Sequence, residues 1–112
     1  MPTEEHILQQ QITQFCRLRH FIVIDCDIMD GLKYAKDSAR YPFIIHHKRM
    51  GYQKGQPDMI IMKKGKVWCL ELKSAKGKQS KEQKEYQEMC IKNGIPYLVI
   101  KNLEDLKFLE NC

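Results

Sequence analysis

The order of apolar and polar residues in the first half of the chain predicts a helix followed by a strand. Residues 3–19 have a helical pattern that Thr3 can cap, with an apolar stripe formed by Leu8, Ile12, Phe15 and Cys16. The β-branched run at 21–24 predicts the first strand. The stretch 25–54 has no clear period, and only a short helix around 43–50 is indicated there.

The second half of the chain has a clearer pattern. The apolar run 59–62, a turn at 63–66 with Gly65 at a positive φ angle, and the run 67–73 predict a β-hairpin. A lysine-rich loop then leads to a helix over 81–92, which Asn93 and Gly94 end. A buried strand at 96–100 and a short helix from Asn102 to Leu109 follow. This order predicts an α/β fold with a mixed β-sheet flanked by helices.

Composition limits the class of protein. The chain has 112 residues, 43% of them hydrophobic and 29% charged, which predicts one compact domain over 1–112. No apolar run approaches the ~18 residues of a membrane span, and no secretory signal is recognised, so we expect no membrane association. The five cysteines have no CxxC spacing and are expected to be reduced thiols of an intracellular protein. The net charge of +5 suits a polyanionic partner without identifying one.

The register of the hairpin predicts the candidate chemistry. If residues 64 and 65 form its turn, Asp58 lies directly opposite Glu71. The two carboxylates would then be ~5 Å apart at Cβ and on one face of the sheet, where they repel each other. The alternation of side chains along a strand puts Lys73 on the same face.

A hard divalent cation would relieve this repulsion. Mg²⁺ takes carboxylate oxygens and water, so Asp58 and Glu71 could bind it, with the backbone carbonyl of Leu72 as a further ligand. Lys73 would then orient the attacking water. The alternative is that Glu71 and Lys73 form an ordinary surface pair and that Asp58 is a turn residue. The apolar neighbours of Glu71 argue against this alternative, because a lone buried carboxylate is costly.

Several of these residues resemble a known nuclease signature. Residues 55–58 (GQPD) followed by 71–73 (ELK) resemble the PD-(D/E)XK motif, and more closely the VRR-NUC (virus-type replication-repair nuclease) family. Residues 51–58 match that family's G-x-x-x-G-x-P-D, and 77–83 match its G-x-x-S-x-x-Q. Glu5 and Gln9 resemble its N-terminal acidic helix. The resemblance covers most of the chain and departs most over 25–50.

The resemblance implies a restriction-endonuclease-like fold and a phosphodiesterase that acts on DNA with Mg²⁺ or Mn²⁺. Asp58 and Glu71 would be metal ligands, Lys73 would position water, and Glu5 would be a further acid near the metal. Short stand-alone members, often bacterial or viral, cleave branched DNA such as Holliday junctions as homodimers. We therefore expect a homodimeric junction endonuclease in a bacterial cytoplasm or in that of a virus-infected host. Alternatives are a flap-directed or nicking nuclease, a non-catalytic DNA-binding module, and an α/β protein unrelated to nucleic acid.

The supporting residues have more than one interpretation. Glu4 and Glu5 both complement the helix dipole, and both flank the apolar stripe, so the helical pattern does not choose between them. Gln83 fits a capping box with Ser80 and also lies on the inward face of its helix, which favours a supporting role beside the catalytic residues. The lysines of the loop 74–79 suit phosphate contacts. We assign no metal to the adjacent histidines at 46–47, and Trp68 is expected in the core.

Overall fold

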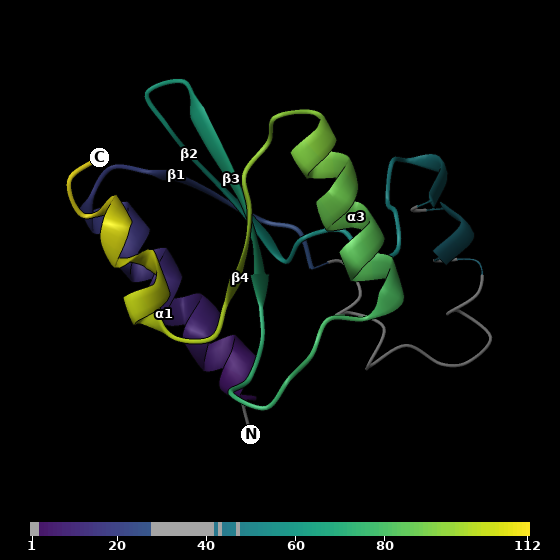
Figure 1. Cartoon of the computed structure of the whole chain (residues 1–112), viewed down its shortest axis with the longest axis horizontal. Helices are drawn as coiled ribbons and strands as arrows, with labels where there is room; N and C mark the ends of the chain where they lie inside the picture. The colour runs from purple at the N-terminus through teal and green to yellow at the C-terminus, as the bar shows by residue number, and fades with distance from the viewer. Residues whose placement is uncertain (1–2, 28–41, 43, 47) are drawn as a thin grey trace.

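A four-stranded mixed sheet lies at the centre of the molecule, with strand order β1-β2-β3-β4 (Figure 1). The computed structural model describes residues 3–27, 42, 44–46 and 48–112. In chain order the elements are α1 (Glu4–Leu18), β1 (Ile22–Asp25), β2 (Met59–Lys63), β3 (Lys66–Leu72), α3 (Lys81–Lys92), β4 (Tyr97–Ile100) and the 3₁₀ helix η2 (Leu103–Leu109).

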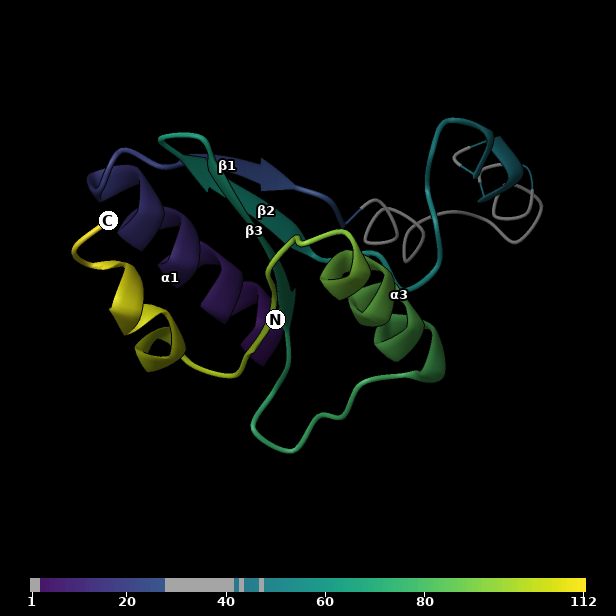
Figure 2. The ribbon, with the colours of Figure 1, turned by 45° about the horizontal axis from the view of Figure 1, so that its top comes forward.

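Helices cover both faces of this sheet. Helices α1 and η2 lie side by side on one face and α3 lies on the other, which two views show (Figures 1 and 2). Strands β1, β2 and β3 pair antiparallel, whereas β3 and β4 pair parallel across the α3 connection. The predicted α/β fold with a mixed sheet and flanking helices is therefore confirmed. The last helix is a 3₁₀ helix rather than an α-helix.

The boundaries of the first two elements follow from local hydrogen bonds. The Thr3 hydroxyl accepts the N–H of His6 and caps α1, as predicted. The N–H of Phe21 donates to the carbonyl of Cys16 at 2.9 Å, so Phe21 belongs to the turn that closes the helix after Leu18. For this reason β1 begins at Ile22, one residue later than predicted.

The hairpin between β2 and β3 has the predicted register. Lys64 and Gly65 have φ angles of 51° and 79°, the two positive values of a type I′ turn, whereas the sequence predicted a positive φ at Gly65 alone. Met62 pairs with Val67, and the pairing continues outward residue by residue to Met59 and Leu70. Beyond that pair the N–H of Asp58 also donates to the carbonyl of Leu70 at 2.9 Å, so the predicted pairing of Asp58 with Glu71 lies outside the observed ladder and stays a prediction.

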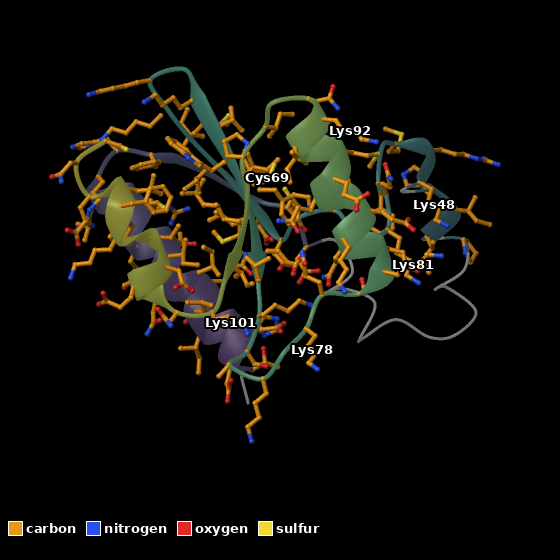
Figure 3. The ribbon with its side chains drawn as sticks, in the orientation of Figure 1. Lys48, Cys69, Lys78, Lys81, Lys92 and Lys101 are labelled. Carbon is orange, nitrogen blue, oxygen red and sulfur yellow. The ribbon has the colours of Figure 1, made fainter. Side chains whose placement is uncertain are left out.

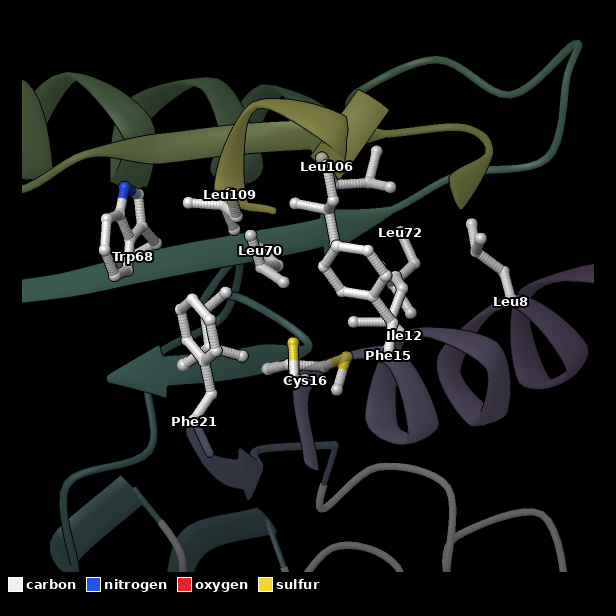
Figure 4. Packing of buried hydrophobic residues seen from close by; sticks show 13 residues of the cluster. Leu8, Ile12, Phe15, Cys16, Phe21, Trp68, Leu70, Leu72, Leu106 and Leu109 are labelled. Carbon is white, nitrogen blue, oxygen red and sulfur yellow. The ribbon is translucent and has the colours of Figure 1, made fainter. Parts of the chain in front are cut away.

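The main core lies between α1, η2 and one face of the sheet (Figure 4). The predicted stripe of α1 is buried there, and Trp68 is also buried, with its ring 5.8 Å from that of Phe21. Trp68 is thus a core residue, as predicted. Along β3, Trp68, Leu70 and Leu72 face this core, whereas Cys69 belongs to a smaller cluster beneath α3. The alternation puts Glu71 on that second face.

The remaining predictions concern the cysteines and the stretch 25–54. All five cysteines are free, and three of them, Cys16, Cys69 and Cys90, are buried. The backbone at 42, 44–46 and 48–49 is helical, in agreement with the short helix predicted around 43–50. Residues 28–41, 43 and 47 lie outside the described part of the chain. None of the described helices has the length and apolar character that crossing a membrane requires.

Candidate functional site

Asp58 is fixed at the point where three strands meet. Its backbone N–H donates to the carbonyl of Leu70 at 2.9 Å, and its own carbonyl accepts the N–H of Cys26 at 2.8 Å. Its carboxylate oxygen Oδ2 accepts the N–H of Leu72 at 2.7 Å. The Asp58 side chain is therefore held at the C-terminal end of β3, beside Leu72, the residue that follows Glu71.

Glu71 is fully buried on β3. Its oxygen Oε1 accepts hydrogen bonds from the Tyr97 hydroxyl at 2.7 Å and from the Gln79 amide nitrogen Nε2 at 3.3 Å. No donor among the described residues reaches its other oxygen, Oε2. A buried carboxylate oxygen without a partner is costly, and such groups in proteins are usually explained by an ion or a water.

A small cavity beside Asp58 brings the N-terminal helix into the site. Its volume is about 90 Å³, and it is lined by Thr3, Glu5, His6, Gln9, Asp27, Asp58 and Leu72. Within a strand, the N–H and C=O of one residue point to the same neighbour. Because Leu72 donates its N–H to Asp58, its carbonyl also faces the Asp58 side.

This cavity distinguishes the two acids at the start of α1. Glu5 lines it, whereas Glu4 is exposed and does not. The helical pattern alone left the two acids equivalent. The packing of α1 against the sheet is what puts Glu5 next to Asp58.

The charges around Asp58 are mainly negative. Burial raises the pKa of Asp58 to about 6, and the hydrogen bond from the Leu72 N–H partly offsets this. The nearby charges of Asp27, Glu5 and Glu71 raise the pKa further. Asp27 was not predicted as a site residue because it lies in the stretch without a clear period. Acids placed this close together favour the binding of a positive ion.

A second cavity of about 250 Å³ opens on the α3 side of Asp58, and Gln83 lines it together with Ser80 and Asp27. Gln83 also forms the predicted capping box, because its Oε1 accepts the Ser80 N–H while the Ser80 hydroxyl accepts the Gln83 N–H. Both interpretations of Gln83 therefore agree with its position. Its supporting role stays a prediction.

Gly55 lets the segment before Asp58 lie against the start of α3. Its φ angle is +89°, and a Cβ atom there would lie 2.3 Å from the carbonyl oxygen of Glu82. Only glycine fits this contact without a shift of one backbone against the other. Glycine at position 55, three residues before Asp58, thus has a steric reason that does not involve catalysis.

Lys73 follows β3 directly and extends its ladder, since its N–H donates to the carbonyl of Ile100 at 2.9 Å. Alternation puts its half-buried side chain on the face of Glu71. Its stem passes close to Gly77, where a Cβ atom would lie 3.3 Å from Lys73 Cδ. In the described part of the chain, no ion pair joins Lys73 to Asp58 or Glu71. Its catalytic role stays a prediction.

The oxygen atoms of this site fit a divalent cation. The described residues contain no group of three His, Cys, Asp or Glu side chains that could hold a metal ion. Mg²⁺ needs fewer protein ligands, because it keeps several waters and is typically bound through one or two carboxylates. Hard oxygen donors come from Asp58, from the carbonyl of Leu72 and from the Oε2 of Glu71, which no described donor reaches. A cation would satisfy that oxygen and offset the acidic charge.

Two residues that contact Glu71 were missed by the sequence interpretation. Tyr97 was placed in a buried strand, and Gln79 in a polar loop. A tyrosine within an apolar strand does carry a signal, because its hydroxyl needs a partner when it is buried. The sequence offers no comparable signal for Gln79, whose contact with Glu71 depends on the path of the loop.

Lysines border the site on the side of the loop before α3. Lys76 lines a surface groove with Glu5 and Ser74, and Lys101 Nζ donates to the carbonyl of Ala75 at 3.4 Å. Lys78 also lies on this loop, far from Lys92 at the other end of α3 (Figure 3). This distribution puts positive charge around the acidic centre.

Comparisons with known proteins agree with this architecture. A family model described as "Nuclease-related domain" (NERD) matches residues 26–112. A solved structure described as "VRR_NUC domain" is 18% identical, with a TM-score of 0.69 over 98% of this chain and 98% of that one. A second, a "VRR_NUC domain protein", is 21% identical, with a TM-score of 0.65 over 97% of this chain and 86% of that one. The search of curated proteins finds no match.

These findings confirm the resemblance to VRR-NUC proteins in the fold. At identities of 18% and 21%, the two solved structures speak for the architecture alone. The family model adds a match in sequence over residues 26–112, a range that contains Asp58, Glu71 and Lys73. The chain therefore belongs to the nuclease-related domain family and has the fold of VRR_NUC domains.

Proposed function

We propose that the protein is an endonuclease that hydrolyses phosphodiester bonds of DNA with Mg²⁺ or Mn²⁺. Family and fold support a nuclease. The observation that carries the proposal is the fully buried Glu71, whose Oε2 has no donor among the described residues and whose charge raises the pKa of the nearby Asp58. A fully buried carboxylate close to a second, partly buried acid favours the binding of a cation.

Each of the proposed ligands comes from an element that the fold holds in place. Asp58 and Glu71 would bind the ion through carboxylate oxygens, and Leu72 through its backbone carbonyl. Glu5 would reach it from α1 through the cavity of about 90 Å³, which has room for water. A divalent cation bound there supplies Lewis acidity to the scissile phosphoryl group.

Lys73 and Gln83 would act on the substrate side. The Lys73 ammonium would orient the attacking water and offset negative charge that develops at the phosphoryl group. Gln83, at the start of α3, would support the site through the cavity that it shares with Asp58.

The proposed substrate is branched DNA such as a Holliday junction. The lysines of the loop before α3 would contact phosphates next to the acidic centre. Two symmetric cuts across a four-way junction require two active sites, which a two-fold symmetric homodimer provides. The free thiols of the chain fit an intracellular setting.

The test is cleavage of four labelled DNAs, namely a four-way junction, a flap, a nicked duplex and a linear duplex. Each is incubated with Mg²⁺, Mn²⁺ or EDTA and with wild type, Asp58→Asn or Lys73→Ala. Lys92→Ala serves as the control, because Lys92 lies at the far end of α3 (Figure 3). We expect metal-dependent cleavage, fastest on the junction, by wild type and the control only.

Other outcomes would revise the proposal in defined ways. Preferential cleavage of the flap, or single-strand nicks, would favour a flap-directed or nicking nuclease. Binding without cleavage by every protein would favour a non-catalytic module, and undiminished cleavage by Lys73→Ala would remove the role proposed for Lys73. Sedimentation of the protein with and without the junction tests the homodimer.

A further inference from the structure

The hydrogen bonds to Glu71 are distributed unequally between its two oxygens. Oε1 accepts both the Tyr97 hydroxyl and the Gln79 amide, whereas Oε2 accepts nothing from the described residues. We propose that Tyr97 and Gln79 are positioning residues that present Glu71 to the metal through Oε2 alone, and that this arrangement selects Mg²⁺ and Mn²⁺ against Ca²⁺. This inference rests on the metal site of the proposed function.

Tyr97 is held rigidly where it meets Glu71. It lies on β4 opposite Cys69, and two positions further along the same parallel ladder Glu71 lies opposite Val99. Tyr97 and Glu71 therefore share the α3 face of the sheet, and their oxygens are 2.7 Å apart. The ring of Tyr86 on α3 packs against the ring of Tyr97, with centroids 6.3 Å apart. The phenol thus has little freedom to release Oε1.

Gln79 adds a second donor and links Glu71 to α3. Its amide nitrogen lies 3.3 Å from Glu71 Oε1 and 2.9 Å from Gln87 Oε1, so both of its hydrogens have an acceptor. The opposite orientation of the Gln79 amide would turn its oxygen toward a carboxylate that cannot donate. Because Gln87 belongs to α3, the loop residue is held from both sides.

This arrangement determines how Glu71 can bind a cation. A carboxylate oxygen offers two lone-pair sites, and both sites of Oε1 are taken by the two donors. A cation is left with Oε2 and binds Glu71 through one oxygen. Mg²⁺ favours few carboxylate oxygens in an octahedral shell, whereas Ca²⁺ takes six to eight oxygens and readily binds both oxygens of one carboxylate. Occupying Oε1 therefore disfavours the larger ion.

The test is to titrate the whole chain, without DNA, with Mn²⁺, Mg²⁺ or Ca²⁺ and to measure each dissociation constant by calorimetry. Tyr97→Phe removes only the hydroxyl that donates to Oε1. Tyr86→Phe is the matched control, because it removes a neighbouring hydroxyl from the same aromatic pair without touching Glu71. We expect Tyr97→Phe to weaken Mn²⁺ binding about tenfold and Ca²⁺ binding much less, so that the preference for Mn²⁺ falls. Tyr86→Phe should bind Mn²⁺ and Ca²⁺ with the wild-type affinities.

Gln79→Met provides the second arm and stands in for Tyr97→Phe if that variant does not fold. It keeps the length of the side chain, removes the amide donor, and should shift the Mn²⁺ to Ca²⁺ ratio in the same direction. An unchanged ratio in both variants would overturn the positioning role while leaving the metal site intact. Equal shifts in Tyr97→Phe and Tyr86→Phe would also overturn it, because general packing would then be the cause. Wild-type protein that binds no Mn²⁺ would overturn the proposed function itself.

Discussion

Replacing Asp58 with asparagine should stabilise the metal-free protein while it abolishes catalysis. Burial and three neighbouring acids raise the pKa of Asp58 from 3.8 to about 6, so the ionised carboxylate is less favourable in the folded than in the unfolded chain. Asparagine carries no charge and keeps a side-chain oxygen that can accept the N–H of Leu72. The variant thus removes the electrostatic penalty and retains the structural hydrogen bond.

The magnitude follows from the size of the shift. A change of about two pKa units corresponds to about 3 kcal/mol. Because the side chain is only partly buried, screening by water and ions reduces the expected gain in unfolding free energy to about 1–2 kcal/mol. A raised acid pKa means that stability is complete below the unfolded pKa and is lost as the pH rises through the folded pKa. The gain from Asp58→Asn should therefore be near zero at about pH 4 and reach its full value above about pH 7.

The assay is urea unfolding of wild type and Asp58→Asn in EDTA, at intervals from about pH 4 to about pH 8. Glu85→Gln is the control, since Glu85 is an exposed acid on α3 that pairs with Lys81 across one helical turn. Its effect should stay within about 0.5 kcal/mol at every pH. Two results would refute the reasoning. One is an Asp58→Asn protein with a lower unfolding free energy than wild type at about pH 8, and the other is a gain in unfolding free energy that does not change with pH.

The same pair of proteins should respond oppositely to metal. Mn²⁺ at about 100 times its dissociation constant should add about 2.7 kcal/mol to the unfolding free energy of wild type. Asp58→Asn should gain far less, because one ligand has lost its charge. A similar gain in both proteins would place the ion elsewhere.

Three further outcomes are expected. Gly55→Ala should lower the unfolding free energy by more than about 1 kcal/mol in urea, and by more than Gly51→Ala, because both positions have positive φ but only Gly55 also abuts the backbone of α3. Lys73→Ala should lower kcat in single-turnover cleavage by about 10²-fold or more with unchanged DNA affinity, and an equal loss in Lys92→Ala would contradict this. The double substitution Lys76→Ala with Lys78→Ala should weaken DNA binding and reduce the salt slope measured by fluorescence anisotropy by about two, with no such change in Lys92→Ala.

Local rules were enough to predict the hairpin and its register as far as Met59 and Leu70. A tight turn at Lys64 and Gly65 allows one pairing, and a slip by one residue would turn Met59 and Ile61 away from the main core. The same reasoning located the caps at Thr3 and Ser80, because capping depends on residues within one turn. The resemblance to nuclease motifs likewise depends on residues that lie close together in the sequence.

Contacts between distant segments could not be obtained in this way. The Tyr97 hydroxyl meets Glu71 across 26 residues, and Gln79 joins it from a loop without regular structure. Glu5 rather than Glu4 faces Asp58 because of how α1 packs on the sheet, and Asp27 adds its charge from the end of β1. Sequence periodicity describes which face of an element is buried, but not what lies across from it. The hydrogen bonds and charge interactions of the site depend on which residues lie across from each other. These interactions act over a few ångströms, so they form only once the elements are packed together.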